Sequence, residues 1–228
     1  MTDPLSRTIQ NESPRWIELR RSLHQIPELA FCEYKTAERL AREFDALGLD
    51  VTTGIAGTGL TADLDTGRTG TDILLRAELD GLPIEDRTEA PYRSTHPGRA
   101  HSCGHDGHCA ILVGAAQTLI PHADRLAGRI RFLLQPAEET ARGARAMIDH
   151  GALDGWTPRA VLALHGWPGL PTGTLATKPG TLTAGCDAFA IHITGKGGHV
   201  ARPEKALSPL PGMARMIRAA PSLCGSDR

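Results

Sequence analysis

Residues 129–164 read RIRFLLQPAEETARGARAMIDHGALDGWTPRAVLAL, and this stretch contains the pattern that decides the fold. The segment Arg129–Leu134 predicts a strand, Ala141–His150 predicts a helix, and Ala160–Leu164 predicts a short, continuously apolar strand. Strands and helices that alternate in this way are typical of an α/β sheet with a substantial parallel part. The stretch therefore predicts a layered α/β fold.

Further elements are expected on the N-terminal side of this stretch. Two amphipathic helices, Pro14–Leu29 and Lys35–Leu47, come first. A helix rich in Ala, Leu and Ile follows at His108–Leu119, with Asp106 available as its N-cap. Between them lie three strand-like segments separated by Gly, Thr and Asp turns: Asp50–Thr53, Leu60–Leu64 and Ile73–Leu79. We therefore expect a mixed, largely parallel sheet sandwiched by helices.

The character of the sequence changes in its last quarter. Gly and Thr become frequent over Gly169–Gly185, Asp187–Thr194 alternates like a half-buried strand, and Ala206–Ala220 predicts a helix with prolines near its start. These changes indicate a domain boundary near Gly185. We expect one domain over residues 1–185 and a second, smaller α+β element over residues 186–228.

Composition and charge exclude several classes of protein. The 25 Lys and Arg against 26 Asp and Glu give a formal net charge of −1, without the basic excess of a nucleic-acid-binding protein. No stretch reaches the roughly 18 consecutive apolar residues that cross a bilayer, and Met1–Arg21 lacks the apolar centre of a secretory signal. The five cysteines show no framework spacing. We expect a cytoplasmic protein with neither nucleic acid nor membrane as a partner.

Residues that bind metals or protons follow three of the predicted strands. Asp80 follows the first of these strands, Glu138 and Glu139 follow the second, and His165 follows the third. A fourth group, HSCGHDGH at residues 101–108, lies in the loop that opens a helix. Ligands of open α/β sheets gather beyond the carboxyl ends of the strands. Four segments therefore deliver metal-type side chains to one expected edge.

The loop and the glutamate pair each allow two interpretations. A thiolate and an imidazole at Cys103 and His105 favour zinc or a similar first-row ion. In the alternative, Asp106 caps a helix, Cys103 packs as a small apolar group, and the histidines are solvated. For Glu138 and Glu139, one carboxylate binds a cation while the other moves protons, or both are solvated acids at a helix start. The combination of all four segments favours the metal site.

Seven collinear motifs carry a resemblance to a known family. They are RRSLHQIPELAF (20–31), GIAGTGL (54–60), LLRAELDGLPI (74–84), HSCGHDGHCAILVGAA (101–116), QPAEE (135–139), LALHGWP (162–168) and GKGGHVARP (195–203). The chain resembles the amidohydrolase branch of the M20 metallopeptidases, which includes hippurate hydrolases, N-acyl-amino-acid amidohydrolases and auxin-conjugate hydrolases. The CGHDGH and QPAEE motifs are the most specific part of this resemblance. Glu78 stands where the family usually has an Asp.

The resemblance implies a zinc-exopeptidase-like fold and a two-metal hydrolase site. Glu138 matches the general base, and Asp80 and Asp106 match positions near the metals with an orienting or bridging role. His199 matches the residue that the smaller domain offers to a substrate oxygen, often across a dimer. Four residues match the family's metal ligands: Cys103, His105, Glu139 and His165. The implied metal is Zn or Mn, with Co and Ni as further candidates.

The resemblance also implies how the chain divides and what it does. Residues 1–185 match a catalytic domain without its closing segment, and residues 186–228 match the first part of a lid domain that forms homodimers. The family's last metal-ligand histidine has no counterpart, so a second metal is expected to bind weakly. The segment that closes the family's sheet has no counterpart either, so an apolar face or strand edge is expected to be unpaired. The implied function is metal-dependent hydrolysis of N-acyl amino acids or similar small amides.

Two alternatives stand beside this function. One is a catalytically impaired, truncated fragment or pseudoenzyme that binds metal or a partner chain. The other is a small zinc-binding module built on four closely spaced residues: Cys103, His105, His108 and Cys109. Those four lie too close together for the usual paired-ligand loops, so the second alternative is disfavoured.

Overall fold

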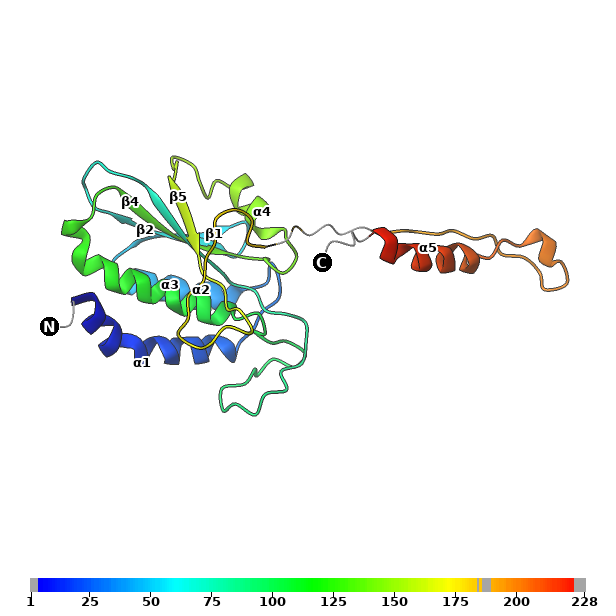
Figure 1. Ribbon diagram of the computed structural model, residues 1–228, viewed down its shortest axis with the longest axis horizontal. Coiled ribbons are helices and arrows are strands. Elements are labelled where there is room, and N and C mark those ends of the chain that lie inside the picture. The colour runs from blue at the N-terminus through cyan, green and yellow to red at the C-terminus, as the bar shows by residue number, and fades with distance from the viewer. Residues whose placement is uncertain (1–3, 184, 186–189, 224–228) are drawn as a thin grey trace. The chain divides into compact units, whose positions relative to one another are not determined.

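The chain folds into two compact units. The computed structural model describes residues 4–183, 185 and 190–223. Contacts between residues divide the chain into the units Met1–Leu175 and Ala176–Arg228. Figure 1 traces the chain from its blue N-terminal helix to its red C-terminal helix.

The first unit is built on a five-stranded mixed sheet in the order β1–β2–β4–β3–β5. The strands are β1 Asp50–Ile55, β2 Gly59–Asp65, β3 Ile73–Glu78, β4 Arg129–Gln135 and β5 Ala160–Ala163. β2 pairs antiparallel with both β1 and β4, whereas β3 pairs parallel with both β4 and β5. Four strands therefore run in one direction, and the predicted mixed α/β fold is confirmed.

Helices cover both faces of this sheet (Figure 1). Phe132 and Leu134 of β4 lie in the larger core, which the helices α1, α2 and α3 cover, whereas Leu133 between them packs with Met147 of α4 in a smaller core. The alternation follows from the two-residue period of a strand. The helices are α1 Pro4–His24, α2 Tyr34–Ala46, α3 His105–Leu119, the 3-10 helix η1 Ile120–Arg125 and α4 Gly143–Asp149.

The first helix differs from its prediction at both ends. The described part of α1 begins at Pro4 and contains Pro14 in its interior, whereas the sequence predicted a start at Pro14. α1 ends at His24, before the predicted Leu29. Pro27 explains this early end, because a proline disfavours helical backbone in the residue before it and cannot donate a hydrogen bond to the helix.

Two later helix starts also differ from the prediction. α3 begins at His105 with Gly104 as its N-cap, at a φ of 89°, so the expectation that Asp106 caps the helix is wrong. α4 begins at Gly143 rather than at Ala141, because Ala141 has a φ of 55° and left-handed backbone cannot continue a right-handed helix.

The second unit contains little regular structure among its described residues. Lys196 and Leu207 form an isolated bridge, followed in the chain by α5, Leu210–Leu223, with the 3-10 turn η2, Pro203–Lys205, inside the connecting loop. The strand predicted over Asp187–Thr194 falls partly outside the described residues, and residues 190–194 form no strand. α5 begins four residues after the predicted Ala206, which places Pro211 in its first turn, where the missing N–H of a proline is best tolerated.

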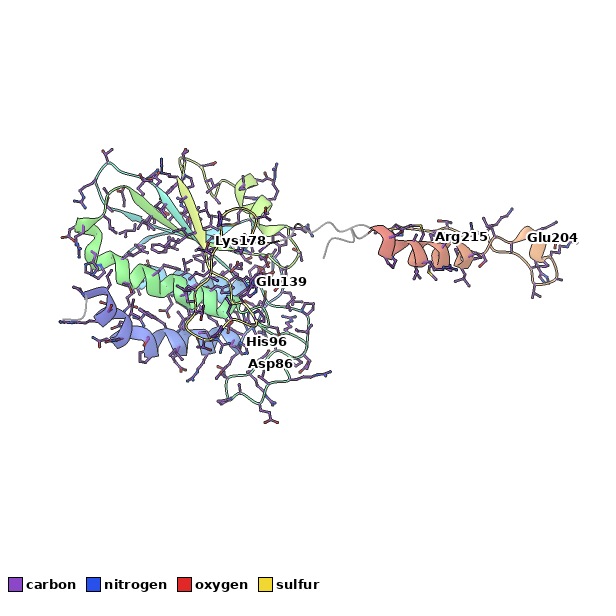
Figure 2. All side chains as sticks on the ribbon, in the orientation of Figure 1. Asp86, His96, Glu139, Lys178, Glu204 and Arg215 are labelled. Carbon is purple, nitrogen blue, oxygen red and sulfur yellow. The ribbon has the colours of Figure 1, made fainter. Side chains whose placement is uncertain are left out.

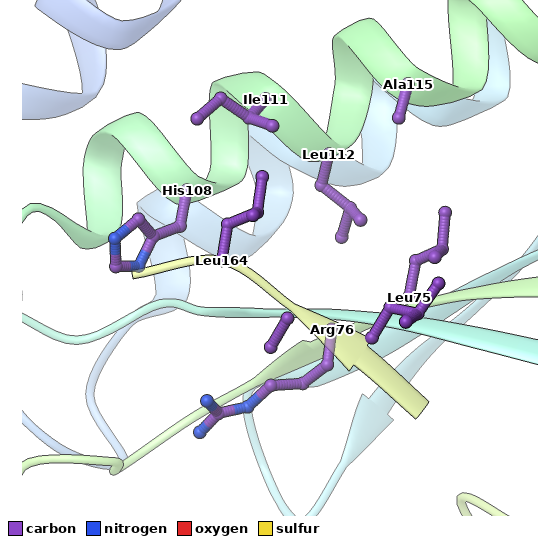
Figure 3. A pocket seen from close by; sticks show the side chains of 9 residues that line it. Leu75, Arg76, His108, Ile111, Leu112, Ala115 and Leu164 are labelled. Atoms are coloured by element: carbon purple, nitrogen blue, oxygen red, sulfur yellow. The ribbon is translucent and has the colours of Figure 1, made fainter. Parts of the chain in front are cut away.

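β5 forms an apolar edge of the described sheet. It pairs with β3 on one side, and its Val161 and Leu162 together with the following Leu164 are more than half exposed. Beside this edge lies a cavity of about 330 Å³ between α3 and the strands, in which Arg76 and His108 are the polar lining residues (Figure 3). Among the described helices, none is long and apolar enough to span a membrane.

Candidate metal centre

The parallel strands bring the predicted site residues to one edge of the sheet. β3, β4 and β5 run in the same direction, so the segments that follow them meet at their carboxyl ends. α3 begins at this edge, and Glu139 lies beside that end of the helix (Figure 2). The site residues placed here are Asp80 after β3, Glu138 and Glu139 after β4, His165 after β5, and Cys103 and His105 at the start of α3.

The four predicted metal ligands and the predicted base lie within a few ångströms of one another. Cys103 Sγ is 3.3 Å from His165 Nε2. His105 Nε2 is 3.6 Å from a carboxylate oxygen of Glu138 and 3.9 Å from one of Glu139. In each of the groups Cys103–His105–His165 and His105–Glu138–Glu139, the candidate ligand atoms lie within 4.8 Å of one another. His105 is common to both groups, which places it at the middle of the cluster.

Two buried atoms of this cluster have no hydrogen-bond partner within the described part of the chain. They are His105 Nε2 and Glu139 Oε1. A buried polar atom without a partner costs roughly 1–3 kcal/mol, so such atoms are rare without a ligand. Thiolate, imidazole and carboxylate are the donors that zinc and similar ions prefer. The residues therefore fit a divalent first-row ion.

Asp80 orients two of these ligands. His105 Nδ1 donates to the Asp80 carbonyl oxygen at 2.7 Å, which leaves Nε2 as the ring nitrogen that faces the carboxylates of the cluster. The Asp80 carboxylate accepts the Glu139 backbone N–H at 2.9 Å. Burial acts to raise the pKa of Asp80, but the hydrogen bonds from His105 and the Glu138 and Glu139 backbone outweigh it and lower that pKa. Asp80 is therefore an anionic support for the cluster, as carboxylates beside ligand histidines commonly are.

The surroundings of Cys103 disfavour its thiolate form. Burial, together with the neighbouring carboxylates of Glu139 and Glu138, raises the pKa of the Cys103 thiol to about 12. The thiol is therefore protonated at neutral pH in the absence of a cation. Since a metal ion binds the thiolate, binding at Cys103 releases a proton and becomes weaker at low pH.

A third group of candidate ligands, Glu78, His105 and His108, is already partly satisfied. His108 Nδ1 and a Glu78 carboxylate oxygen are 2.8 Å apart, and the Arg76 guanidinium hydrogen-bonds the other Glu78 oxygen. Burial acts to raise the pKa of Glu78, but the bond to His108 and the charge of Arg76 outweigh it and lower that pKa. These residues therefore form a paired support beside the cluster.

The disfavoured zinc-binding module does not form. The Cys109 thiol is buried in α3 and donates to the Glu78 backbone carbonyl at 3.0 Å. Among the described residues, no candidate ligand group contains Cys109. Cys109 therefore does not act as the fourth ligand of that module.

Asp106 points away from the cluster toward α1. Its carboxylate lies 2.8 Å from the Arg20 guanidinium and 2.8 Å from His24 Nδ1. Burial acts to raise the pKa of Asp106, but His24, His101 and Arg20 outweigh it and lower that pKa. This buried group ties the start of α3 to α1. The sequence analysis did not single out Arg20 or His24, although both lie in the quoted motif RRSLHQIPELAF.

Glu33 is a second residue that the sequence analysis missed. Its buried carboxylate accepts hydrogen bonds from the backbone N–H of Phe31 and Ala137 and from the Thr58 hydroxyl. Ala137 has a φ of 51°, a conformation that a non-glycine residue keeps only when its surroundings hold it. Glu33 thus supports the turn that presents Glu138. No local pattern marks it, because two of its three partners are 25 and 104 residues away along the chain.

His199 belongs to the second unit, Ala176–Arg228. Its Nδ1 accepts the Ala201 backbone N–H at 3.2 Å. The role expected of His199 toward a substrate at the cluster stays a prediction.

Comparisons with known proteins agree with the chemistry of the cluster. A model of "Peptidase family M20/M25/M40" matches residues 74–224. The N-acetyl-L-cysteine deacetylase of Bacillus subtilis strain 168 is 42% identical over 203 residues, which cover 89% of this chain and 48% of that protein. The IAA-amino acid hydrolase ILR1-like 5 of Arabidopsis thaliana is 36% identical over 88% of this chain and 46% of its own length.

A solved structure shares the fold. The crystal structure of the YXEP protein of Bacillus subtilis, described as a dinuclear metal binding peptidase from the M20 family, superposes with a TM-score of 0.70. It is 36% identical, and the match covers 74% of this chain and 47% of that chain. The chain thus spans about half the length of the relatives that it matches.

Proposed function

The chain belongs to the peptidase family M20/M25/M40, and from this membership we propose that it is a metal-dependent amidohydrolase. Its substrates are N-acyl amino acids or similar small amides, a class to which the named substrates of the deacetylase and of the IAA-amino acid hydrolase belong. The observation that carries the proposal is the buried His105 Nε2, which has no hydrogen-bond partner among the described residues and has a thiol and two carboxylates around it.

Four side chains would hold the ion: Cys103, His105, Glu139 and His165. A divalent ion supplies Lewis acidity, which polarises an amide carbonyl and lowers the pKa of water. Thiolate favours Zn, whereas the carboxylate and imidazole ligands also suit Mn, Co or Ni. His105 is fully buried and Glu139 is partly buried, so these two ligands are held in place by the fold.

Glu138 moves the proton in this mechanism. Its side chain is 37% exposed, against 20% for Glu139, so Glu138 is the carboxylate of the pair that faces entering water. Its carboxylate takes a proton from the attacking water molecule and returns it to the leaving amine nitrogen. Glu139 donates its backbone N–H to Asp80, which anchors the turn from which both glutamates reach the cluster.

The two parts of the chain have different roles in the proposal. Residues 1–185 form the catalytic domain in the cytoplasm, and residues 186–228 form the start of a lid that pairs with the lid of a second copy. His199 in that lid contacts a substrate oxygen. The quoted motif GKGGHVARP supports this role through the family resemblance.

A second candidate function is metal binding with little or no turnover. The observation in its favour is that the described residues supply four of the expected ligands, which satisfy one four-coordinate ion rather than two. In this case the chain binds fewer than two metal equivalents and hydrolyses amides feebly.

One set of measurements separates the two candidates. Metal content is measured after loading with Zn²⁺ or Mn²⁺, and hydrolysis of N-acetyl and N-benzoyl amino acids is followed for the wild type and for Glu138→Gln. An active enzyme loses turnover by about 10²- to 10⁴-fold on this substitution, the range for a positioned general base, and keeps its metal. Weak, unchanged turnover in both proteins supports the second candidate, and absence of bound metal contradicts both.

A further inference from the structure

Two polar side chains lie beside the proposed ligands without belonging to them. Glu78 at the end of β3 and His108 in the first turn of α3 are 2% and 6% exposed. Their mutual contact is a 2.8 Å hydrogen bond between His108 Nδ1 and a Glu78 carboxylate oxygen. The mechanism above uses neither residue.

The partners of His108 determine its tautomer. An ionised carboxylate only accepts hydrogen bonds, so His108 Nδ1 carries a hydrogen and donates the hydrogen bond to Glu78. His108 Nε2 is then an acceptor, and the backbone N–H of Gly166 donates to it at 3.1 Å. Both ring nitrogens are therefore engaged in hydrogen bonds.

Glu78 is itself anchored from the other side. The Arg76 guanidinium hydrogen-bonds one Glu78 oxygen, and the same guanidinium bonds Gln135 Oε1 through Nε at 3.1 Å and Nη2 at 2.8 Å. Gln135 is the last residue of β4. The chain of contacts thus begins on the two central strands of the sheet and ends at the Gly166 amide.

The Gly166 amide directly follows the proposed ligand His165. β5 ends at Ala163, so residues 164–167 leave the sheet and lose the support of ladder hydrogen bonds. His165 is exposed and depends on neighbouring groups for its position: its ring lies 4.9 Å from the His108 ring, centroid to centroid, and its Nε2 lies 3.3 Å from Cys103 Sγ. Within the described residues, the Gly166 N–H bond to His108 joins this segment to α3 and, through Glu78, to β3. The Gly166 carbonyl in turn accepts a hydrogen bond from His165 Nδ1 at 2.7 Å, so the position of Gly166 sets the orientation of the His165 ring.

We propose that Glu78 and His108 are positioning residues, which hold the Gly166 amide and thereby keep His165 beside Cys103. This inference rests on the proposed function, because His165 matters only as a metal ligand. Glu78 reaches both Arg76 and His108 with its two oxygens, so the longer carboxylate found here fits a bridging role. The arrangement has the same logic as the carboxylates and carbonyls that orient ligand histidines in metal sites.

The test measures Co²⁺ and Zn²⁺ affinity of the full 228-residue chain. The absorption bands of bound Co²⁺ report thiolate ligation and coordination geometry. His108→Ala is expected to weaken metal affinity by about 10- to 100-fold, the range for loss of an orienting partner, and to change the Co²⁺ spectrum. His108→Gln is expected to restore most of the affinity, since its amide can donate to Glu78 and accept from Gly166.

A second pair of variants tests the amide without touching the buried pair. Gly166→Ala keeps the N–H and would place its Cβ in open space, so it is expected to leave affinity unchanged. Gly166→Pro removes the N–H and is expected to weaken metal binding as His108→Ala does. Glu78→Ala combined with His108→Ala should lose no more affinity than either alone, because both act through one contact.

The outcomes separate this inference from the proposed function. If the wild-type chain binds no Co²⁺, the metal centre itself is wrong and the inference falls with it. If the wild type binds Co²⁺ and His108→Ala and Gly166→Pro bind it equally well with the same spectrum, only the positioning role is overturned. The exposed His150, which bonds Ala146 of its own helix, provides the control variant His150→Ala, for which no change is expected.

Discussion

The metal cluster and the Glu33 carboxylate are both buried and acidic, yet they differ in how far their polar atoms are satisfied by hydrogen bonds. The Glu33 carboxylate receives three hydrogen bonds, from Phe31, Thr58 and Ala137. The cluster instead leaves His105 Nε2 without a partner in the described structure. A satisfied carboxylate such as that of Glu33 supports the backbone around it, whereas the unsatisfied His105 Nε2 lies among a thiol and two carboxylates, a donor set that fits a metal ion.

The pKa values express the same difference. Burial raises the pKa of Glu33 despite its hydrogen bonds, because no cation lies among its partners. Burial also acts on Asp80 and Glu78, but hydrogen bonds and, for Glu78, the charge of Arg76 outweigh it and lower both pKa values. The anionic form is therefore favoured for the two carboxylates that support the metal cluster and disfavoured for Glu33.

The largest predicted effect is the loss of metal affinity when the central ligand, His105, is removed. His105→Ala is expected to lower Zn²⁺ affinity by more than about 100-fold, beyond the range for losing an orienting partner. It should also abolish the stabilisation that Zn²⁺ gives the wild type, about 2.7 kcal/mol at 100 times Kd. Thermal unfolding with and without Zn²⁺ measures both effects, and the exposed His150→Ala variant is the control. Equal stabilisation of His105→Ala and the wild type would contradict the assignment.

The next largest predicted effect is on the free energy of unfolding of the metal-free chain. Glu33→Ala leaves the buried N–H groups of Phe31 and Ala137 without an acceptor, and we expect the free energy of unfolding to fall by about 3 kcal/mol. Thr58→Val removes one donor to the same carboxylate and should cost about 1 kcal/mol. Urea unfolding of the metal-free chain measures both losses. A loss that appears only in the metal-loaded protein would place Glu33 in the metal cluster instead.

The smallest predicted effect is on the pH dependence of stability, and it comes from Asp86, which belongs to neither region. Backbone N–H groups of Ser94 and Thr88 and the Thr88 hydroxyl bond the Asp86 carboxylate, and the Ser94 bond is the main cause that lowers the pKa of Asp86 to about 2. A lowered pKa adds stability above the unfolded value of 3.8, and this stability is lost as the pH falls toward 2. Asp86→Asn should flatten this part of the stability–pH profile. An unchanged acid limb would contradict the prediction.

Local patterns predicted most strands of the first unit and the neighbourhood of the site. The apolar segments at 129–134 and 160–164 became β4 and β5 nearly to the residue, because a two-residue or continuous apolar pattern depends only on neighbouring side chains. Helix starts were predicted less well: Gly104 rather than Asp106 caps α3, since the cap is decided by a backbone torsion that Asp106 does not share. The strand order β1–β2–β4–β3–β5 was not predicted, because pairing joins residues far apart in sequence.

The sequence by itself determined the donor types of the site, a thiol, imidazoles and paired carboxylates, and the family to which the chain belongs. Only the tertiary structure decided which of these donors are already satisfied. It pairs one carboxylate oxygen of Asp106 with Arg20 and His24, and it pairs His108 with Glu78 and Gly166. His105 Nε2, in contrast, has no hydrogen-bond partner among the described residues. The physical reason is that burial and hydrogen-bond satisfaction depend on contacts between distant segments, and residue identity alone does not specify those contacts.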